Sequence, residues 1–183
     1  MAMDHFREEV VVKHQRALEE VMYYLSFVVM VFTGFIGLMN LSAFISAIPT
    51  YGFDFITLIY ALINAGICVF LVLRRNRLRT EYEYTFTNGA FDFAMVFNNN
   101  KRKSLGSLNV KTVDAFGPVN SSSFQRYIST PGVKQSRWFL NRGAELYYFY
   151  FSKDGNKRII ICEPSAEMVA DVRHYLPFGA YQE

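Results

Sequence analysis

The chain has 183 residues and a formal net charge of +3, and 51% of its residues are hydrophobic while only 19% are charged. A typical soluble domain has about a quarter of its residues charged, so the composition argues against a purely soluble protein. The two cysteines, Cys68 and Cys162, exclude a disulfide framework and a cysteine-rich metal site, and they favour a reducing compartment.

Residues 1–20 form an N-terminal segment with three basic and five acidic side chains. A helix that lies on a membrane surface is usually richer in lysine and arginine. We therefore expect a cytoplasmic segment, either a short helix or a strand, that packs on the rest of the protein or on a partner.

Two apolar runs follow, and each is long enough to cross a bilayer, which takes about 20 residues. Residues 21–48 and 55–73 are predicted to be transmembrane helices, because Asp54 is the only charged residue between Val21 and Leu73. The first run is too long for the apolar part of a signal peptide. Residues 49–54 form a short extracytoplasmic tip, so the two helices are predicted to be an antiparallel hairpin.

Basic residues flank both spans on the side away from the tip. Seven lie there, whereas the tip contains no lysine or arginine. The positive-inside rule then places both termini in the cytoplasm, in a multi-pass protein of the cell's inner (cytoplasmic) membrane. Of these seven basic residues, three precede the first span: Arg7, Lys13 and Arg16. The other four follow the second span, within the juxtamembrane segment 74–79: Arg74, Arg75, Arg77 and Arg79.

Polar and small residues within the spans favour helix packing. Asn40 and Asn64 lie at similar depth and are predicted to pair across the hairpin. Neither span contains Asp, Glu, Lys, Arg or His, so we favour packing, within the hairpin or between copies, over a polar path or ligand site. Small residues at four-residue spacing are the other predicted contacts: Ser42 with Ser46, Ala43 with Ala47, and Ala61 with Ala65.

The pattern changes to alternation from residue 80 onward, which predicts a mostly-β domain over 80–183. Clear strands are expected at 80–87, 90–97, 104–110, 145–152 and 157–163, with short ones at 126–129 and 136–140. Asn88-Gly89 predicts a tight hairpin turn, and residues 98–103 a polar loop. A C-terminal helix is expected over 165–176. The total is about seven strands and one helix.

Two spans followed by this order of strands and helix resemble the uncharacterised small membrane-protein families of Gram-positive-type bacteria with a cytoplasmic pleckstrin-homology-like (PH-like) domain. The resemblance implies two near-orthogonal sheets capped by the C-terminal helix. It also implies a role in membrane-bound assembly or lipid sensing. Eukaryotic relatives that bind phosphoinositides place basic residues in their first hairpin loop. Here the predicted first loop is only Asn88-Gly89, which argues against that binding mode.

Two basic clusters are candidate contacts for anionic lipid, each residue contributing about 1 kcal/mol. In the simplest interpretation, the first cluster only sets the topology and anchors the second span. It consists of Arg74, Arg75, Arg77 and Arg79. Lys101, Arg102 and Lys103, on the predicted loop, either orient the domain at the membrane or blunt a sheet edge. Residues 80–183 hold 12 basic and 10 acidic side chains, so a nucleic-acid partner is not expected.

Nothing in the sequence assembles a catalytic or cofactor site. No glycine-rich phosphate loop, metal-ligand spacing or nucleophile motif is present, and we expect neither catalysis nor a cofactor. The prediction is a non-catalytic, membrane-anchored interaction or scaffolding module whose partner is another membrane protein or a second copy. The alternative is recognition of anionic lipid by the juxtamembrane arginines and residues 101–103.

Overall fold

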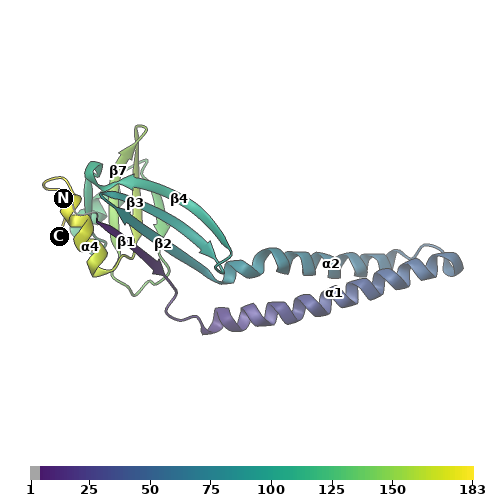
Figure 1. Cartoon of the computed structure of the whole chain (residues 1–183). Helices are drawn as coiled ribbons and strands as arrows, with labels where there is room; N and C mark the ends of the chain where they lie inside the picture. Colours follow the sequence, from purple (N-terminus) through teal and green to yellow (C-terminus); the bar gives the residue numbers. More distant parts are fainter. Residues whose placement is uncertain (1–4) are drawn as a thin grey trace. The chain divides into compact units, whose positions relative to one another are not determined.

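The computed structural model describes residues 5–183, which divide into two compact units. Gln15–Thr80 form one unit, and the described residues up to His14 join Glu81–Glu183 in the other. The membrane hairpin is therefore inserted into the β-rich unit rather than placed before it (Figure 1). The predicted domain over 80–183 was incomplete, because it omitted the strand that precedes the first span.

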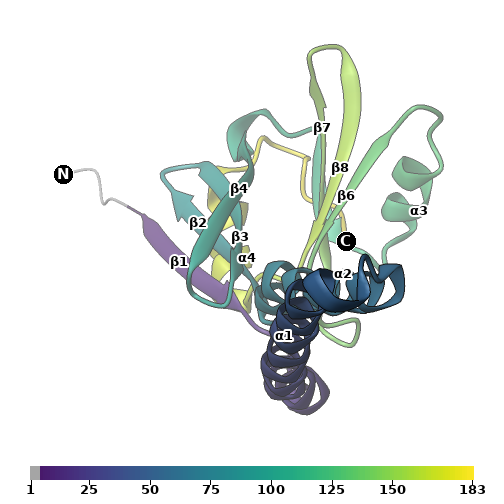
Figure 2. The ribbon, with the colours of Figure 1, turned by 90° about the vertical axis from the view of Figure 1, so that its right-hand side faces the viewer.

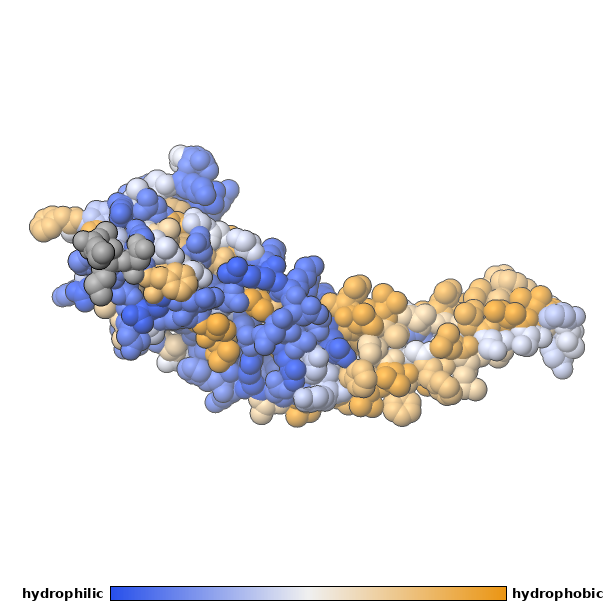
Figure 3. All heavy atoms as spheres, viewed as in Figure 1, coloured by the Kyte–Doolittle hydropathy of each residue, from blue (hydrophilic) through white to orange (hydrophobic). Residues whose placement is uncertain are grey.

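The inserted unit contains the two expected helices, α1 (Ala17–Tyr51) and α2 (Phe55–Arg74), followed by the short 3-10 helix η1 (Arg75–Leu78). Both long helices have the length and composition to cross a membrane. Apolar side chains gather over them, whereas the surface of the β-rich unit is mostly hydrophilic (Figure 3). The tip is shorter than predicted, because α1 continues through Pro49 and Asp54 caps α2. The Asp54 carboxylate accepts from Ile56 N at 3.0 Å.

The first sheet has the order β1-β2-β3-β4, in which β1 is antiparallel to β2 and β3 is antiparallel to β4. Asn88-Gly89 joins β2 to β3 with positive φ angles of 50° and 95°, as the predicted turn requires. The predicted loop over 98–103 was wrong for Lys101, Arg102 and Lys103, which begin β4 because pairing with β3 extends to Phe97↔Lys101. The strands are β1 (Phe6–Val11), β2 (Thr80–Thr87), β3 (Ala90–Phe97) and β4 (Lys101–Asn109).

The second sheet has the order β5-β7-β8-β6, in which β6 runs parallel to β8. The strand predicted at 126–129 was wrong, since these residues end a helix whose first turn is capped by the Ser121 hydroxyl. The strand predicted at 136–140 is β6, shifted two residues toward the N-terminus, and β5 was not predicted. The elements are β5 (Ala115–Pro118), α3 (Ser122–Ile128), β6 (Lys134–Trp138), β7 (Tyr147–Lys153), β8 (Asn156–Cys162) and α4 (Ala166–Tyr175), with a 3-10 turn η2 at Val110–Thr112.

Aromatic side chains fill the space between the sheets. Figure 2 shows the strands of the two sheets, with α4 beside the first sheet. Phe91 and Phe93 of β3 contact Phe149 of β7, and α4 adds Met168 and Val172. A second cluster lies on the other face of the second sheet, where α3 packs on it through Phe124 and Tyr127. The second sheet is thus buried on both faces, which explains its continuous apolar runs.

The C-terminal tail covers the free edge of β5. Phe116 N donates to Ala180 O, and Gln182 N donates to Phe116 O, both at 2.8 Å. A Cβ atom at Gly117 would lie 2.2 Å from Gln182 O, so only glycine permits this approach.

We expect Gly117→Ala to displace the tail and to lower the free energy of unfolding by about 1–3 kcal/mol. Gly143→Ala is the control, because a Cβ there meets nothing within 4 Å. Amide exchange and denaturant unfolding of the detergent-solubilised chain measure both effects. A Gly117→Ala protein whose Gln182 amide stays protected would contradict this account.

Candidate functional site

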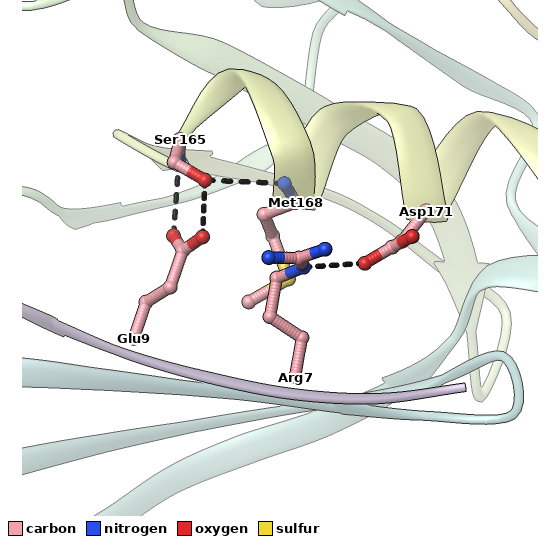
Figure 4. Close-up of polar contacts among 5 residues, drawn as sticks. All are labelled: Arg7, Glu9, Ser165, Met168 and Asp171. Carbon is pink, nitrogen blue, oxygen red and sulfur yellow. Dashed lines mark hydrogen bonds and ion pairs between the residues drawn. The ribbon is translucent and has the colours of Figure 1, made fainter. Parts of the chain in front are cut away.

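Strand β1 is tied to helix α4 by side chains on its inward face. Glu9 accepts hydrogen bonds from the backbone N of Ser165, at 3.0 Å, and from the Ser165 hydroxyl. Ser165 is the N-cap of α4, and its Oγ accepts from Met168 N at 3.1 Å (Figure 4). A carboxylate at this position satisfies the amide groups and the dipole at the start of the helix.

A second contact joins β1 and α4, through the residue two positions before Glu9 on the same face of β1. Arg7 Nε lies 2.5 Å from Asp171 Oδ2, in the middle of α4 (Figure 4). This hydrogen bond raises the pKa of Arg7. The side chains are 37% and 22% exposed, so solvent screens the pair and its contribution to stability is small. We call the contacts of Glu9 with Ser165 and of Arg7 with Asp171 together the β1–α4 clamp.

The segment that leaves β1 toward the membrane hairpin is held by Asn141. Its Nδ2 donates to Val12 O at 2.9 Å, and its Oδ1 accepts from His14 N at 2.8 Å. Asn141 is itself positioned by Glu163, which is only 8% exposed and accepts from the backbone N of Leu140 and Asn141.

This arrangement continues into the core through Tyr84. The Tyr84 hydroxyl donates to Trp138 O and accepts from Glu163 N at 3.3 Å. Burial raises the pKa of Tyr84, which stays protonated and able to donate. Burial likewise raises the pKa of Cys162, so this thiol is protonated and inert. The first residues after β1 are thus connected to the centre of the domain.

An open depression of about 540 Å³ lies where these contacts meet. Its main polar groups, Glu9, Asn141 and Glu163, are already hydrogen-bonded to protein atoms. The depression is therefore better explained as the surface of a structural joint than as a ligand site. His14, Ala144, Pro164 and Glu167 complete much of its lining.

The juxtamembrane arginines separate into two kinds. Arg79 forms an ion pair with Glu20 of α1, which raises the pKa of Arg79, and its guanidinium lies 3.8 Å from the Tyr23 ring centroid. Arg75 lies 4.9 Å from the same ring. These two join the ends of α1 and α2, whereas Arg74 and Arg77 have exposed side chains.

The basic residues at 101–103 do not form one patch. Successive side chains of a strand point to opposite faces, so Arg102 is separated from its two neighbours. Arg102 is bound at 2.5 Å by Glu83 of β2. Lys101 and Lys103 are exposed on the terminal strand of the sheet, the position at which lysine prevents pairing with another chain.

Comparison with protein families identifies the fold. A family model described as "Bacterial PH-like domain (DUF6106)" matches residues 3–181. The chain belongs to this family of bacterial PH-like domains. The resemblance inferred from the order of spans, strands and C-terminal helix is thereby confirmed. No curated protein and no solved structure matches the chain.

The position of the hairpin within the PH-like domain changes one conclusion drawn from the sequence. The first connection of the first sheet joins β1 to β2 and consists of the membrane hairpin, so Asn88-Gly89 is the second connection. The argument against headgroup binding from a short first loop therefore rested on the wrong loop. Arg16 and the four juxtamembrane arginines all lie in that first connection.

Within the hairpin, a glycine provides the close approach of the helices. A Cβ at Gly37 would lie 3.4 Å from Ala65 N and 3.7 Å from Ala61 O, so Ala61 and Ala65 lie at this contact. Asn64 donates to Tyr60 O in its own helix at 2.9 Å, and its pairing with Asn40 stays a prediction. Ser42 and Ser46 are exposed in the single chain, and contacts between copies through them are untested.

The sequence offered no catalytic site, and the absence of catalysis stays a prediction. Among the residues that the structure describes, no group of three or more His, Cys, Asp or Glu side chains is placed to hold a metal. The structure does bring His5 and His174 together, with ring centroids 5.7 Å apart. Glu9, Asn141 and Glu163 were missed, because their partners are distant in sequence. Only Ser165 had a local signal, as the residue before a predicted helix.

The β1–α4 clamp predicts that Glu9→Gln and Ser165→Ala each lower the free energy of unfolding of the PH-like domain by about 1–2 kcal/mol. Their effects should be less than additive, since both remove the same contact. Trp138, the only tryptophan, reports on this unit alone when the full chain is unfolded in detergent.

Glu8→Gln is the matched control, because it removes the same charge from the same strand on the exposed face. We expect Glu8→Gln to change stability by less than about 0.5 kcal/mol. Equal effects of the Glu8 and Glu9 substitutions would show that net charge, and not the clamp, is responsible.

Proposed function

We propose that the protein is a non-catalytic, membrane-anchored interaction module that presents its PH-like domain to a membrane protein partner. The observation that carries this proposal is the insertion of the hairpin between two adjacent, paired strands. Residues 12–16 separate β1 from α1, and Arg79 alone separates η1 from β2. The PH-like domain is therefore connected to the membrane helices at two places by short segments.

Two short connections restrict the domain more than one flexible linker does. A single linker lets a domain sample a volume set by the linker's length, whereas a second connection removes much of that freedom. Confinement beside the bilayer raises the effective concentration for other membrane proteins, so weak contacts suffice. The basic flanks of the hairpin and a tip without lysine or arginine support a cytoplasmic location of the domain and of both termini, in a protein of the inner membrane.

The outward face of β1 is the surface that best suits such a partner. Phe6 and Val10 are 63% and 53% exposed there, on either side of Glu8. Exposed apolar side chains next to a charge are typical of protein interaction surfaces. Because this strand leads directly into α1, a protein bound to it is held near the start of the first span.

Mild-detergent extraction followed by native mass spectrometry tests the proposal. We expect a protein partner in a fixed ratio to the chain, lost on substitution of Phe6 and Val10 by serine while Trp138 fluorescence still reports a folded domain. Phe178→Ser is the control, because it removes an exposed apolar side chain from the C-terminal tail and leaves β1 unchanged. Recovery of the chain alone, or with anionic lipid only, would contradict an interaction module.

Contact with anionic lipid is the second candidate function, and the exposure of Arg74 and Arg77 favours it. Each is predicted to contribute about 1 kcal/mol at an anionic surface. Lys101 and Lys103 are exposed as well, while Arg102 is engaged by Glu83. Of the seven basic residues in the juxtamembrane segment and at 101–103, the lipid function therefore depends on four: Arg74, Arg77, Lys101 and Lys103.

We expect Arg74→Gln combined with Arg77→Gln to reduce the retention of anionic lipid on the extracted protein. The lipid that remains bound should no longer depend on salt concentration. Arg79→Gln removes the same kind of charge but breaks the contacts with Glu20 and Tyr23, so its main effect should be on the thermal stability of the hairpin. Lipid retention that depends equally on Arg74, Arg77 and Arg79 would contradict this division.

A further inference from the structure

The β7–β8 hairpin and the neighbouring β6 carry an excess of positive charge that the proposed function does not use. Residues 130–158 hold six basic and two acidic side chains. Figures 1 and 2 both show the β7–β8 hairpin projecting beyond the strands around it. The basic residues of this region are Lys134, Arg137, Arg142, Lys153, Lys157 and Arg158.

The strand register brings three of these cations to one face. Arg158 of β8 is paired with Lys134 of β6 on one side and with Phe151 of β7 on the other. Directly paired residues point to the same face, so the two cations lie side by side. Lys153 lies two residues beyond Phe151 on that face, as a diagonal neighbour of Arg158. Lys157 pairs with Ser152 and points to the opposite face.

This arrangement is electrostatically unfavourable in the protein alone. Like charges on directly paired residues destabilise a sheet. No carboxylate forms an ion pair with Lys134, Lys153 or Arg158 within residues 5–183. In addition, the Nε atom of Arg158 is buried and has no hydrogen-bond partner in the described chain. A buried donor left without an acceptor costs about 1–3 kcal/mol. A bound anion relieves the repulsion between the neighbouring cations.

We propose that Lys134, Lys153 and Arg158 form a binding site for a phosphoryl group. A phosphate monoester carries a charge of about −1.5 to −2 near pH 7, so it balances about two of the three cations, whereas a carboxylate balances one. Its several oxygens accept from the fork of a guanidinium and from a neighbouring ammonium at the same time. Arg158 supplies the directional contact, and the two lysines supply charge.

The phosphoryl group has two sources with the same chemistry, a lipid headgroup and a soluble phosphate compound. The site shares no residue with the juxtamembrane arginines, residues 101–103 or the outward face of β1. Its failure would therefore leave the proposed function intact, and the failure of the proposed function would leave this site to be judged by its own test.

Titration of the full chain in detergent provides that test. The probes are inorganic phosphate for the soluble source and water-soluble short-chain phosphatidic acid for the headgroup, with short-chain phosphatidylcholine as the neutral headgroup control. Isothermal calorimetry measures affinity for each. Binding of phosphate and phosphatidic acid supports the site with either source, and binding of phosphatidic acid alone assigns it to lipid.

Three substitutions separate a defined site from general electrostatic attraction. We expect Lys134→Gln to weaken binding at least about tenfold. Arg158→Lys should weaken it to a similar extent although no charge is lost, since the guanidinium fork is removed. Lys157→Gln removes the same charge as Lys134→Gln from the other face and should change affinity less than about twofold.

Two results would overturn the proposal. One is the absence of binding of both phosphate and phosphatidic acid to the folded chain. The other is an equal loss of affinity in Lys134→Gln and Lys157→Gln, which is the behaviour of a diffuse positive surface. The fluorescence of Trp138 confirms that each variant is folded before its affinity is compared.

Discussion

The pairing of β1 with β2 is the interaction on which the rest of the structure depends. The two strands pair over their length, from Phe6↔Thr87 to Val11↔Tyr82, although the membrane hairpin separates them in the chain. Without β1, the edge of β2 would be uncovered, and the N-terminus of α4 would lose the carboxylate of Glu9. The β1–β2 pairing thus completes the first sheet and positions α4. It also holds together the two chain segments that flank the hairpin.

The two sheets contribute differently to the molecule. The first is covered on one face and carries the connections to the membrane helices. The second is buried on both faces, by the first sheet and by α3, and the C-terminal tail covers one of its edges. The register of this sheet places Lys134, Lys153 and Arg158 on one face.

Local patterns in the sequence predicted the elements whose signal lies within a few residues. The two spans, the Asn88-Gly89 turn, the β7–β8 hairpin and α4 were expected near their observed positions. Arg126–Ser129 was mistaken for a strand because its aromatic and β-branched residues favour one, while the cap at Ser121 decides for a helix. Lys101, Arg102 and Lys103 were placed in a loop because exposed edge strands have loop-like composition.

Contacts between distant segments could not be predicted in the same way. The role of β1 depends on pairing with β2, which follows the whole hairpin in the chain. Lys134 and Arg158 are neighbours because β6 pairs in parallel with β8, and no turn motif in the sequence indicates a parallel pairing. Among the arginines, the sequence identified the cluster, but only the position of Tyr23 and Glu20 separates Arg75 and Arg79 from the exposed pair.

Hydrogen exchange of the β1 amides in the full chain tests the central claim most directly. Mass spectrometry of the detergent-solubilised protein would compare residues 6–11 with β2 and with the start of α1. The account predicts that β1 exchanges as slowly as β2, and that Glu9→Gln accelerates exchange in β1 and the first turn of α4 together. Rapid exchange throughout residues 6–11 in the unmodified protein would contradict it, because the hairpin would then be joined to the domain at one end only.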